Sequence, residues 1–555
     1  MLRLIPLGFA LLALTAATLL PRPCDRLFLG GVVHTPEGVR RVAIAVTGGR
    51  IVALAEPAEV EAWRKAAGGV VELSGAHVYP GFTESHGHLV AYGAALEQVD
   101  LHGVASFTAV VEEARKAARR LPPGAWLLGR GWDQNLWPEK EFPTHQALSA
   151  AIPDRPVLLR RVDGHAVLLN ARALAAAGIT AATTDPPGGR ILRDDAGAPT
   201  GVLVDDAVEL VEKVLPHPTA ADIERRVLLA SRRLAELGIT EMHDAGTLRS
   251  ELAVLRELQR EGRLPIRVYV MLAGSDDDLL AAELPRGPWR SDDGMLTIRA
   301  VKLFADGALG SRGALLSRPY SDDPTTRGLE VTPPERLSNV VRRAAAAGFQ
   351  PCIHAIGDAA VARVLDIYEH ELGSRAASLR PRVEHAQIVR PTDLARFAPL
   401  GAIASVQPTH CTSDMPWAPA RLGEDRIAWA YRWRSLLQAG ARLCLGSDVP
   451  VESPDPRLGM WAAVTRRPPQ GTHEGGWNLP EALSVEEALA GYTSWAAYAG
   501  FEEDRRGSIA PGRAADFTVV DRDLVLGAPA TILQARVVRA VVAGRDSYVA
   551  GSETR

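Results

Sequence analysis

From residue 217 onward the sequence alternates between short apolar runs and amphipathic stretches, and this pattern constrains the fold most. The apolar runs have the length of buried strands, and the stretches between them have helical periodicity. The predicted strands are 239–243, 266–271, 296–304, 349–354, 381–388, 402–407 and 441–448, preceded by one that leads into 81–89. Eight strand–helix units predict an α/β protein with a (β/α)8 barrel of the TIM type. The alternative is an open doubly wound sheet, but no glycine-rich phosphate fingerprint follows the first strand.

Both ends of the chain are rich in predicted strands, unlike the middle. We expect residues 25–80 and 501–555 to pair into one composite β-sandwich outside a barrel of residues 81–500. Residues 103–217 do not fit the alternation and contain many Gly, Pro and Asp residues. We interpret them as an inserted subdomain after the first strand, placed over the barrel mouth, where it could form a lid.

The first 21 residues predict a secretory signal peptide. A short, weakly basic start is followed by an apolar run over residues 4–20. The alternative is an uncleaved membrane anchor, because such a run approaches the roughly 20 residues that span a bilayer. We therefore expect a secreted, periplasmic or cell-envelope protein, membrane-anchored if the segment is retained. Membrane association is expected through this segment only.

The composition and net charge of the chain limit the kinds of partner that it can bind. The 555 residues are 47% hydrophobic and 23% charged, which is ordinary for a globular protein of more than one domain. The net charge is −4 and there is no long basic run, so nucleic acid is not an expected partner. The sequence leaves a homodimer open.

Residues that bind metals well lie at the ends of several predicted strands. His86 and His88 are two apart, so on a strand both imidazoles point to the same face and can hold one ion. The other strand-end groups are Lys302, His354, His385 and Asp448. In a TIM barrel the carboxyl ends of all strands meet at one mouth, so these six groups predict a metal centre. For Lys302 alone the alternative is a salt bridge to a carboxylate such as Asp306.

The chain resembles the amidohydrolase superfamily, and within it the YtcJ-like branch of the amidohydrolase-3 family, which includes N-substituted formamide deformylases. The order His-x-His, Lys, His, His, Asp carries the resemblance. The matching stretches are 81–89, 301–312, 352–358, 383–386, 405–409 and 446–448, with 129–133, 163–166 and 507–516 in addition. The likeness covers nearly everything after the N-terminal segment.

The resemblance implies a divalent metal centre, most often two zinc ions bridged by a carboxylated Lys302. His86 and His88 would hold the more buried ion with Lys302 and Asp448, and His354 and His385 would hold the second with Lys302. A buried lysine is disfavoured as an ammonium group, which agrees with such a modification.

The implied activity is that of a metal-dependent amidohydrolase. A metal-activated hydroxide would hydrolyse a C–N bond of amide or formamide type in a small, non-peptide molecule, with Asp448 as general base and then acid. The same ligands would also suit an ester, a lactone or a cyclic amide. A non-catalytic binding protein on this scaffold is the remaining alternative.

Seven further residues are predicted to contact substrate, namely Trp132, Asp133, His165, Asp306, Arg312, Gln407 and His410. The alternative for Trp132 is the core of the insertion, and for Asp306 and Arg312 it is loop packing. We expect Glu384 to point away from the metal centre, because neighbours on a strand face oppositely.

Overall fold

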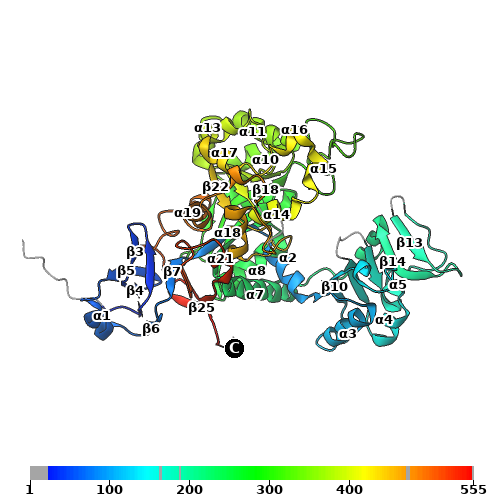
Figure 1. Cartoon of the computed structure of the whole chain (residues 1–555), viewed down its shortest axis with the longest axis horizontal. Coiled ribbons are helices and arrows are strands. Elements are labelled where there is room, and N and C mark those ends of the chain that lie inside the picture. The colour runs from blue at the N-terminus through cyan, green and yellow to red at the C-terminus, as the bar shows by residue number, and fades with distance from the viewer. Residues whose placement is uncertain (1–22, 162–165, 187–188, 471–474, 553–555) are drawn as a thin grey trace, which may run out of the picture.

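The computed structural model describes residues 23–161, 166–186, 189–470 and 475–552. Figure 1 shows a central barrel, sheets from the chain ends on one side of it, and an inserted subdomain on the other. The chain passes from the sheets into the barrel through β7 (His77–Pro80) and β8 (Phe82–Gly87). It leaves the barrel for the insertion after α2 (Leu89–Glu97).

Eight parallel strands form the wall of the barrel and follow one another in chain order. They are β8, β15 (Ile239–Thr247), β16 (Arg267–Ala273), β18 (Leu296–Phe304), β19 (Gln350–Ala355), β20 (Arg382–His385), β21 (Ile403–Val406) and β22 (Arg442–Leu445). The first and last strands meet at their carboxyl ends. There the Asp448 amide donates to the His86 carbonyl at 2.8 Å, and the His88 amide donates to the Val449 carbonyl at 2.8 Å. A nearly closed TIM-type barrel is therefore present, as predicted.

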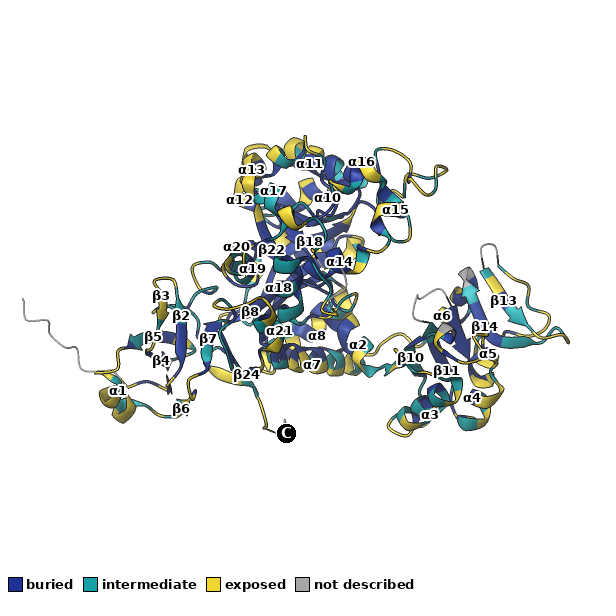
Figure 2. Cartoon of the chain, in the orientation of Figure 1, coloured by how far each residue is buried: buried dark blue, intermediate teal, exposed yellow. Residues whose placement is uncertain are grey.

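Amphipathic helices cover the outside of this wall. They include α7 (Ala220–Glu236), α8 (Arg249–Arg260), α10 (Pro334–Ala346), α11 (Asp358–Leu372), α17 (Trp433–Gln438) and α18 (Pro456–Thr465). Helix α7 shows why they form. Thr219 and Asp222 cap its first turn reciprocally, and Ile223, Val227 and Leu234 form a buried stripe on one face. Figure 2 shows the opposite, exposed face along the bottom of the barrel.

The two ends of the chain share a mixed six-stranded sheet of order β25-β24-β23-β7-β2-β3. Its N-terminal strands are β2 (Val32–Thr35), β3 (Gly38–Arg40) and β7, and its C-terminal strands are β23 (Phe517–Val520), β24 (Val537–Val542) and β25 (Arg545–Val549). A second, four-stranded sheet contains β1 (Arg26–Leu29), β4 (Ala43–Thr47), β5 (Arg50–Ala55) and β6 (Val70–Glu72). Both sheets contribute to one hydrophobic cluster, in which the rings of Phe28 and Phe517 meet edge-on at 4.9 Å.

The insertion is a subdomain with its own sheet, of order β13-β14-β12-β11-β10-β9. The strands are β9 (Val99–Asp100), β10 (Leu127–Trp132), β11 (Val157–Arg161), β12 (Ala166–Leu169), β13 (Gly189–Arg193) and β14 (Pro199–Asp205), with helices α3 (Phe107–Ala118), α4 (Gln146–Ala151) and α5 (Ala171–Ala176). Its two hydrophobic clusters are made of its own residues. Because it buries its apolar surface internally, it stands apart from the barrel in Figure 1. The expected lid is not formed in this arrangement.

Trp132 lies in the core of the insertion instead of in a substrate pocket. Its ring is fully buried and stacks on Trp137 at 5.9 Å, and its Nε1 donates to the Leu159 carbonyl at 2.7 Å. The prediction of a substrate contact is therefore not supported, and the core interpretation is.

Replacing this tryptophan by alanine tests the new placement. Trp132→Ala should cost the insertion about 3–5 kcal/mol of stability, because it leaves a large cavity. We expect kcat/KM at the barrel to change little at temperatures where the insertion stays folded. Leu136→Ala, at an exposed apolar position in the same subdomain, is the matched control for thermal unfolding and limited proteolysis. A loss of turnover without a loss of stability would show that Trp132 contacts the substrate.

Within the described parts of the chain, no helix is long and apolar enough to cross a membrane. The predicted signal segment, residues 1–21, lies outside those parts. Secretion, cleavage and anchoring therefore stay predictions.

Candidate metal centre

Three predicted ligands converge where the first and last strands meet. His86 lies at the end of β8, His88 follows it, and Asp448 follows β22. Asp448 Oδ1 is 3.1 Å from His88 Nε2 and 3.5 Å from His86 Nε2. These atoms are close enough for all three side chains to hold one ion. His86 and His88 are two residues apart and face the same side, and closure of the barrel brings Asp448 next to them. These three side chains form one half of the predicted centre.

Further histidines extend this group across the mouth. His385 ends β20, and its ring centroid lies 4.9 Å from that of His86 and 4.5 Å from that of His354 in β19. His410 in α14 (Pro408–Asp414) stacks on His385, with the ring centroids 6.0 Å apart. Its ligand nitrogen forms a second three-residue cluster with His385 and Asp448. Asp448 therefore lies between two adjacent sets of imidazoles.

Lys302 lies beneath these histidines, almost wholly buried in β18. Its Nζ is 3.1 Å from His86 Nε2. Burial lowers the pKa of Lys302 from its ordinary value, and the charges of Glu384 and Asp448 oppose this shift only in part. No carboxylate forms an ion pair with Lys302 among the residues that the structure describes. The alternative of a salt bridge to Asp306 is therefore not supported.

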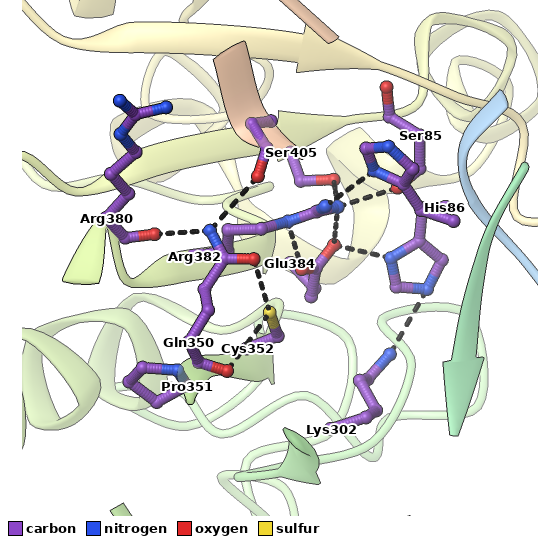
Figure 3. Close-up of polar contacts among 12 residues, drawn as sticks. Ser85, His86, Lys302, Gln350, Pro351, Cys352, Arg380, Arg382, Glu384 and Ser405 are labelled. Carbon is purple, nitrogen blue, oxygen red and sulfur yellow. Dashed lines mark hydrogen bonds and ion pairs between the residues drawn. The ribbon is translucent and has the colours of Figure 1, made fainter. Parts of the chain in front are cut away.

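Glu384 contacts the His86 ring and holds it in place. The sequence had predicted instead that Glu384 would point away from the metal centre. Glu384 Oε2 accepts from His86 Nδ1 at 2.5 Å, so the Nε2 of that ring faces Lys302 and Asp448. Arg382 forms an ion pair with the other carboxylate oxygen at 2.7 Å. Figure 3 shows this chain of contacts running from Arg382 through Glu384 and His86 to Lys302. Carboxylates that fix the ring of a ligating histidine in this way are a common feature of metal sites.

The charge on Glu384 depends on that arginine. Burial would raise the pKa of Glu384, but Arg382 and His86 hold it well below its usual range. Arg382 also contacts three polar groups around it, the Ser85 carbonyl, Ser405 Oγ and His243 Nδ1. The prediction that Glu384 points away fails because β20 ends at His385, whose φ of 73° breaks the alternation of an ideal strand.

Gln407 orients His385 in the same manner. Its Oε1 accepts from His385 Nδ1 at 2.7 Å, and its amide nitrogen donates to the Ser405 carbonyl. The predicted substrate contact thus lies at the centre, but it contacts a histidine that is itself a predicted ligand.

Removing the Gln407 amide should weaken metal binding. We expect Gln407→Ala to lower the affinity for zinc about 10-fold or more, because the ring of His385 loses the partner that fixes its tautomer. Gln387→Ala, which removes an amide bonded to Asp414, is the matched control. Competition with a coloured chelator measures both affinities. Equal affinities in the two variants would show that Gln407 does not position His385.

Backbone strain is concentrated at this centre. Asp448 has a φ of 61°, and His385 and Ala386 have φ values of 73° and 42°, a region that favours glycine. Such conformations cost about 1–3 kcal/mol each and persist where the surrounding structure fixes them. The Asp448 amide is fixed by the His86 carbonyl at 2.8 Å. With this backbone, the Asp448 carboxylate and the His385 imidazole lie close enough to hold one ion.

The remaining predicted contacts divide between the barrel and the insertion. Asp306 is buried and accepts three backbone amides, from Leu315, Ile356 and Gly357, so it holds two mouth loops together. Arg312 is part-exposed and pairs with Asp322. These contacts fit the loop-packing alternative for both residues.

Within the insertion, Asp133 follows β10 and forms an ion pair with Arg161 of β11 at 3.0 Å. His165 lies outside the described residues. Of the six predicted contacts that the structure describes, Gln407 and His410 lie beside the histidines, and Asp306 Oδ1 is 3.5 Å from His354 Nε2.

Besides Glu384, two carboxylates near the histidines were not predicted from the sequence. Glu84 accepts the His86 amide at 3.0 Å and both the amide and the hydroxyl of Ser447, which ties β8 to the segment before Asp448. Asp244, in the carboxyl-terminal half of β15, accepts the Leu89 amide at 2.8 Å and fixes the turn after His88. The sequence could have indicated Glu84, because it lies two residues before His86 and residues two apart on a strand share a face.

The residues fit a divalent transition metal. The Nε2 atoms of His354 and His410 are buried without a hydrogen-bond partner. Burial lowers the pKa of His86 to about 4 and that of His354 to about 3, and the charge of Lys302 adds to both shifts. These rings are therefore neutral near pH 7 and keep a lone pair for a ligand bond. Imidazoles with one carboxylate are typical ligands of zinc and its neighbours.

Comparisons with known proteins agree with this centre. The model of the amidohydrolase family matches residues 69–548. YtcJ of Bacillus subtilis, a protein named as an amidohydrolase, is 34% identical over 484 residues, which cover 86% of this chain and 90% of YtcJ. The N-substituted formamide deformylase of Arthrobacter pascens is 30% identical over 518 residues, with 91% and 94% covered.

A solved structure is similar over the same length. The crystal structure of a metal-dependent hydrolase from Pyrococcus horikoshii OT3 has a TM-score of 0.76 and 31% identity, covering 91% of this chain and 99% of its own. The resemblance stated from the sequence is thereby confirmed. The chain belongs to the amidohydrolase family and is a hydrolase that acts on carbon–nitrogen bonds.

Proposed function

We propose that this protein hydrolyses an amide or formamide bond in a small, non-peptide molecule. The metal centre would be held by His86, His88, His354, His385, Lys302 and Asp448, with two zinc ions and a carboxylated Lys302 between them. The observation that carries the proposal is the set of imidazoles gathered around Asp448 and a buried lysine. That lysine has a lowered pKa, so its amine can combine with carbon dioxide.

A divalent ion bound by these residues lowers the pKa of a water molecule and polarises a carbonyl group. Asp448 moves the proton. Burial would raise its pKa, but the hydrogen bond from His88 and the neighbouring His86 and His385 hold it well below the usual range. Asp448 is therefore a carboxylate at neutral pH. Its Oδ2 would take a proton from the attacking water and return it to the amine nitrogen that leaves.

A cavity of about 430 Å³ gives a place for the nitrogen substituent of the substrate. It is lined by residues of α14 and the segment that follows it, by the segment after Asp448, by Leu458 of α18 and by residues 468–470. Its position next in the chain to His410 and Asp448 suits a substrate with a partly apolar group on nitrogen. The name of the Arthrobacter relative, an N-substituted formamide deformylase, supports the same class.

Matched substrates test the bond that is cleaved. Metal-loaded protein would be given pairs that share acyl and alkyl groups and differ in one atom, such as N-benzylformamide and benzyl formate, with cyclic amides and lactones added. We expect the open amides to be cleaved with the higher kcat/KM relative to their uncatalysed rates. Cleavage of esters or lactones with no amide cleaved would overturn the proposal. Tight binding without cleavage of any substrate would favour a binding protein.

The lysine modification has a test of its own. Protein reconstituted with zinc and ¹³C-labelled bicarbonate should show a carbamate carbon signal by NMR. Lys302→Ala should lack the signal, whereas Lys213→Ala, at an exposed lysine, should keep it. The absence of a signal in the wild type at full zinc occupancy would refute the carboxylated bridge.

A further inference from the structure

Two histidines and an aspartate meet on the six-stranded sheet, and none of them belongs to the metal centre. His34 lies on β2 and His77 on β7, and these parallel neighbours pair at Val32–His77 and Val33–Val78. Asp523 follows β23, the C-terminal strand on the other side of β7. Figure 2 shows β2 and β7 next to each other where the sheet approaches the barrel. The sheet thus brings together residues that are more than 440 positions apart in the chain.

The ligand atoms of these side chains have the spacing of a metal site. His34 Nε2 is 3.0 Å from His77 Nδ1, and His77 Nδ1 is 3.5 Å from Asp523 Oδ2. All three atoms can face one ion. A tetrahedral ion with bonds of about 2.0–2.2 Å places its ligand atoms about 3.3–3.6 Å apart. The observed distances differ from this by a few tenths of an ångström, which side-chain rotation supplies.

The carboxylate is held so that one oxygen is left for an ion. Asp523 Oδ1 accepts from the Tyr79 hydroxyl at 2.9 Å and from the amides of Val525 and Leu526. Oδ2 accepts no hydrogen bond from any residue that the structure describes, and it is the oxygen that faces His77. The ring of Tyr79 also stacks on His34 at 3.9 Å. One tyrosine therefore positions two of the three groups, as partners of metal ligands do.

A hydrogen bond between the two histidines is the simpler account, and it explains only one distance. It leaves Asp523 Oδ2 facing the pair at 3.5 Å, too far for a hydrogen bond. The three side chains are only partly buried, so an ion and a completing water have access. An ion at this place satisfies all three groups at once.

We propose that His34, His77 and Asp523 form a separate structural site for a transition-metal ion of the zinc class. Two imidazoles and a carboxylate are ligands that zinc prefers, and water would complete the tetrahedron. The site joins strands from the N-terminal segment to the segment that follows β23. Ion binding would therefore stabilise the sheet that the two chain ends build together, without entering the reaction.

Metal counting on the full chain tests this site. Protein stripped with a chelator would be loaded with zinc, freed of loosely bound ions, and measured by mass spectrometry of the metal. We expect His34→Gln and Asp523→Asn each to hold one ion per chain less than wild type. Their kcat/KM should stay within about twofold. His217→Gln, at an exposed histidine outside the cluster, should match wild type in both respects.

The expected difference of one ion between wild type and these variants does not depend on how many ions the catalytic centre binds. This experiment can therefore refute the sheet site without refuting the proposed function. Equal ion counts in wild type and both variants would refute the site. So would a dissociation constant for the extra ion above about 100 µM, the range of adventitious surface binding. Asp523→Asn keeps an oxygen for Tyr79 and the two amides, which guards against a variant that fails to fold.

A measurement on the unmodified protein needs no variant. Crystals soaked in zinc should give an anomalous difference peak among His34 Nε2, His77 Nδ1 and Asp523 Oδ2. Thermal unfolding of the stripped protein should also shift upward on addition of zinc, and the part of the shift due to this site should be absent in His34→Gln. No peak at millimolar zinc would overturn the proposal.

Discussion

Replacing Asp448 by asparagine should lower kcat/KM by at least about 10²–10⁴-fold while the protein stays folded. Asparagine keeps the size of the side chain but cannot accept the proton of the attacking water, and general bases contribute a factor of this order. The variant also loses the charge that faces His86 and His88 at 3.5 and 3.1 Å. Rates on the amide of the matched pair, together with circular dichroism and zinc content, measure the effect.

The control for this variant is Asp322→Asn. Asp322 pairs with Arg312 and Arg421 in a part-exposed loop, away from the histidines. We expect it to keep most of the wild-type rate. Near-normal turnover by Asp448→Asn would show that the proton is moved by another group, and the assignment of Asp448 would fall.

Glu384→Gln should give the largest loss of stability in the barrel. Arg382 is fully buried and depends on this carboxylate, with Nε 2.7 Å from Oε1. Removing one partner of a buried ion pair costs about 3–5 kcal/mol, because the other charge is left uncompensated. Zinc affinity should also fall about 10- to 100-fold, since the carboxylate that fixes His86 becomes a neutral amide. Thermal unfolding and chelator competition measure the two effects.

Glu503→Gln is the matched control, because Glu503 pairs with Arg380 at 2.6 Å in a more exposed place. Exposed pairs contribute about 0–1 kcal/mol, so this variant should be nearly as stable as wild type and bind zinc equally well. If the two variants lost equal stability, the buried network behind His86 would not support the centre.

The convergence of four histidines and Asp448 at one mouth was predictable because the argument needed only the strand count. Once residues 239–448 are assigned to alternating strands and helices, the carboxyl ends of the strands meet at one mouth. His86, His88, His354, His385 and Asp448 then converge whatever the details of packing. The pairing of the two chain ends followed from a similar argument, because a few short strands at each end cannot form a stable sheet alone.

The parts that were missed depend on local geometry and on contacts distant in sequence. Glu384 was placed wrongly because a left-handed residue ends its strand, which a sequence pattern does not show. Gln407 was recognised as a mouth residue, but its bond to His385 needs coordinates. Trp132 was predicted to contact substrate, because the strands and helices of the insertion can be arranged only once their shared core is known. The position of the insertion beside the barrel has the same cause.

The most direct test of the proposed metal-dependent amidase activity is to measure bound zinc and amide hydrolysis on the same samples. The His34→Gln background removes the proposed sheet site from the count, and Lys302→Ala serves as the variant without a bridging lysine. We predict no turnover in the stripped protein, and a rise in turnover with zinc occupancy up to two ions per chain in the presence of bicarbonate. Lys302→Ala should show no such recovery. Full turnover in the stripped protein, or full occupancy by zinc without any turnover on the amides, would contradict the account.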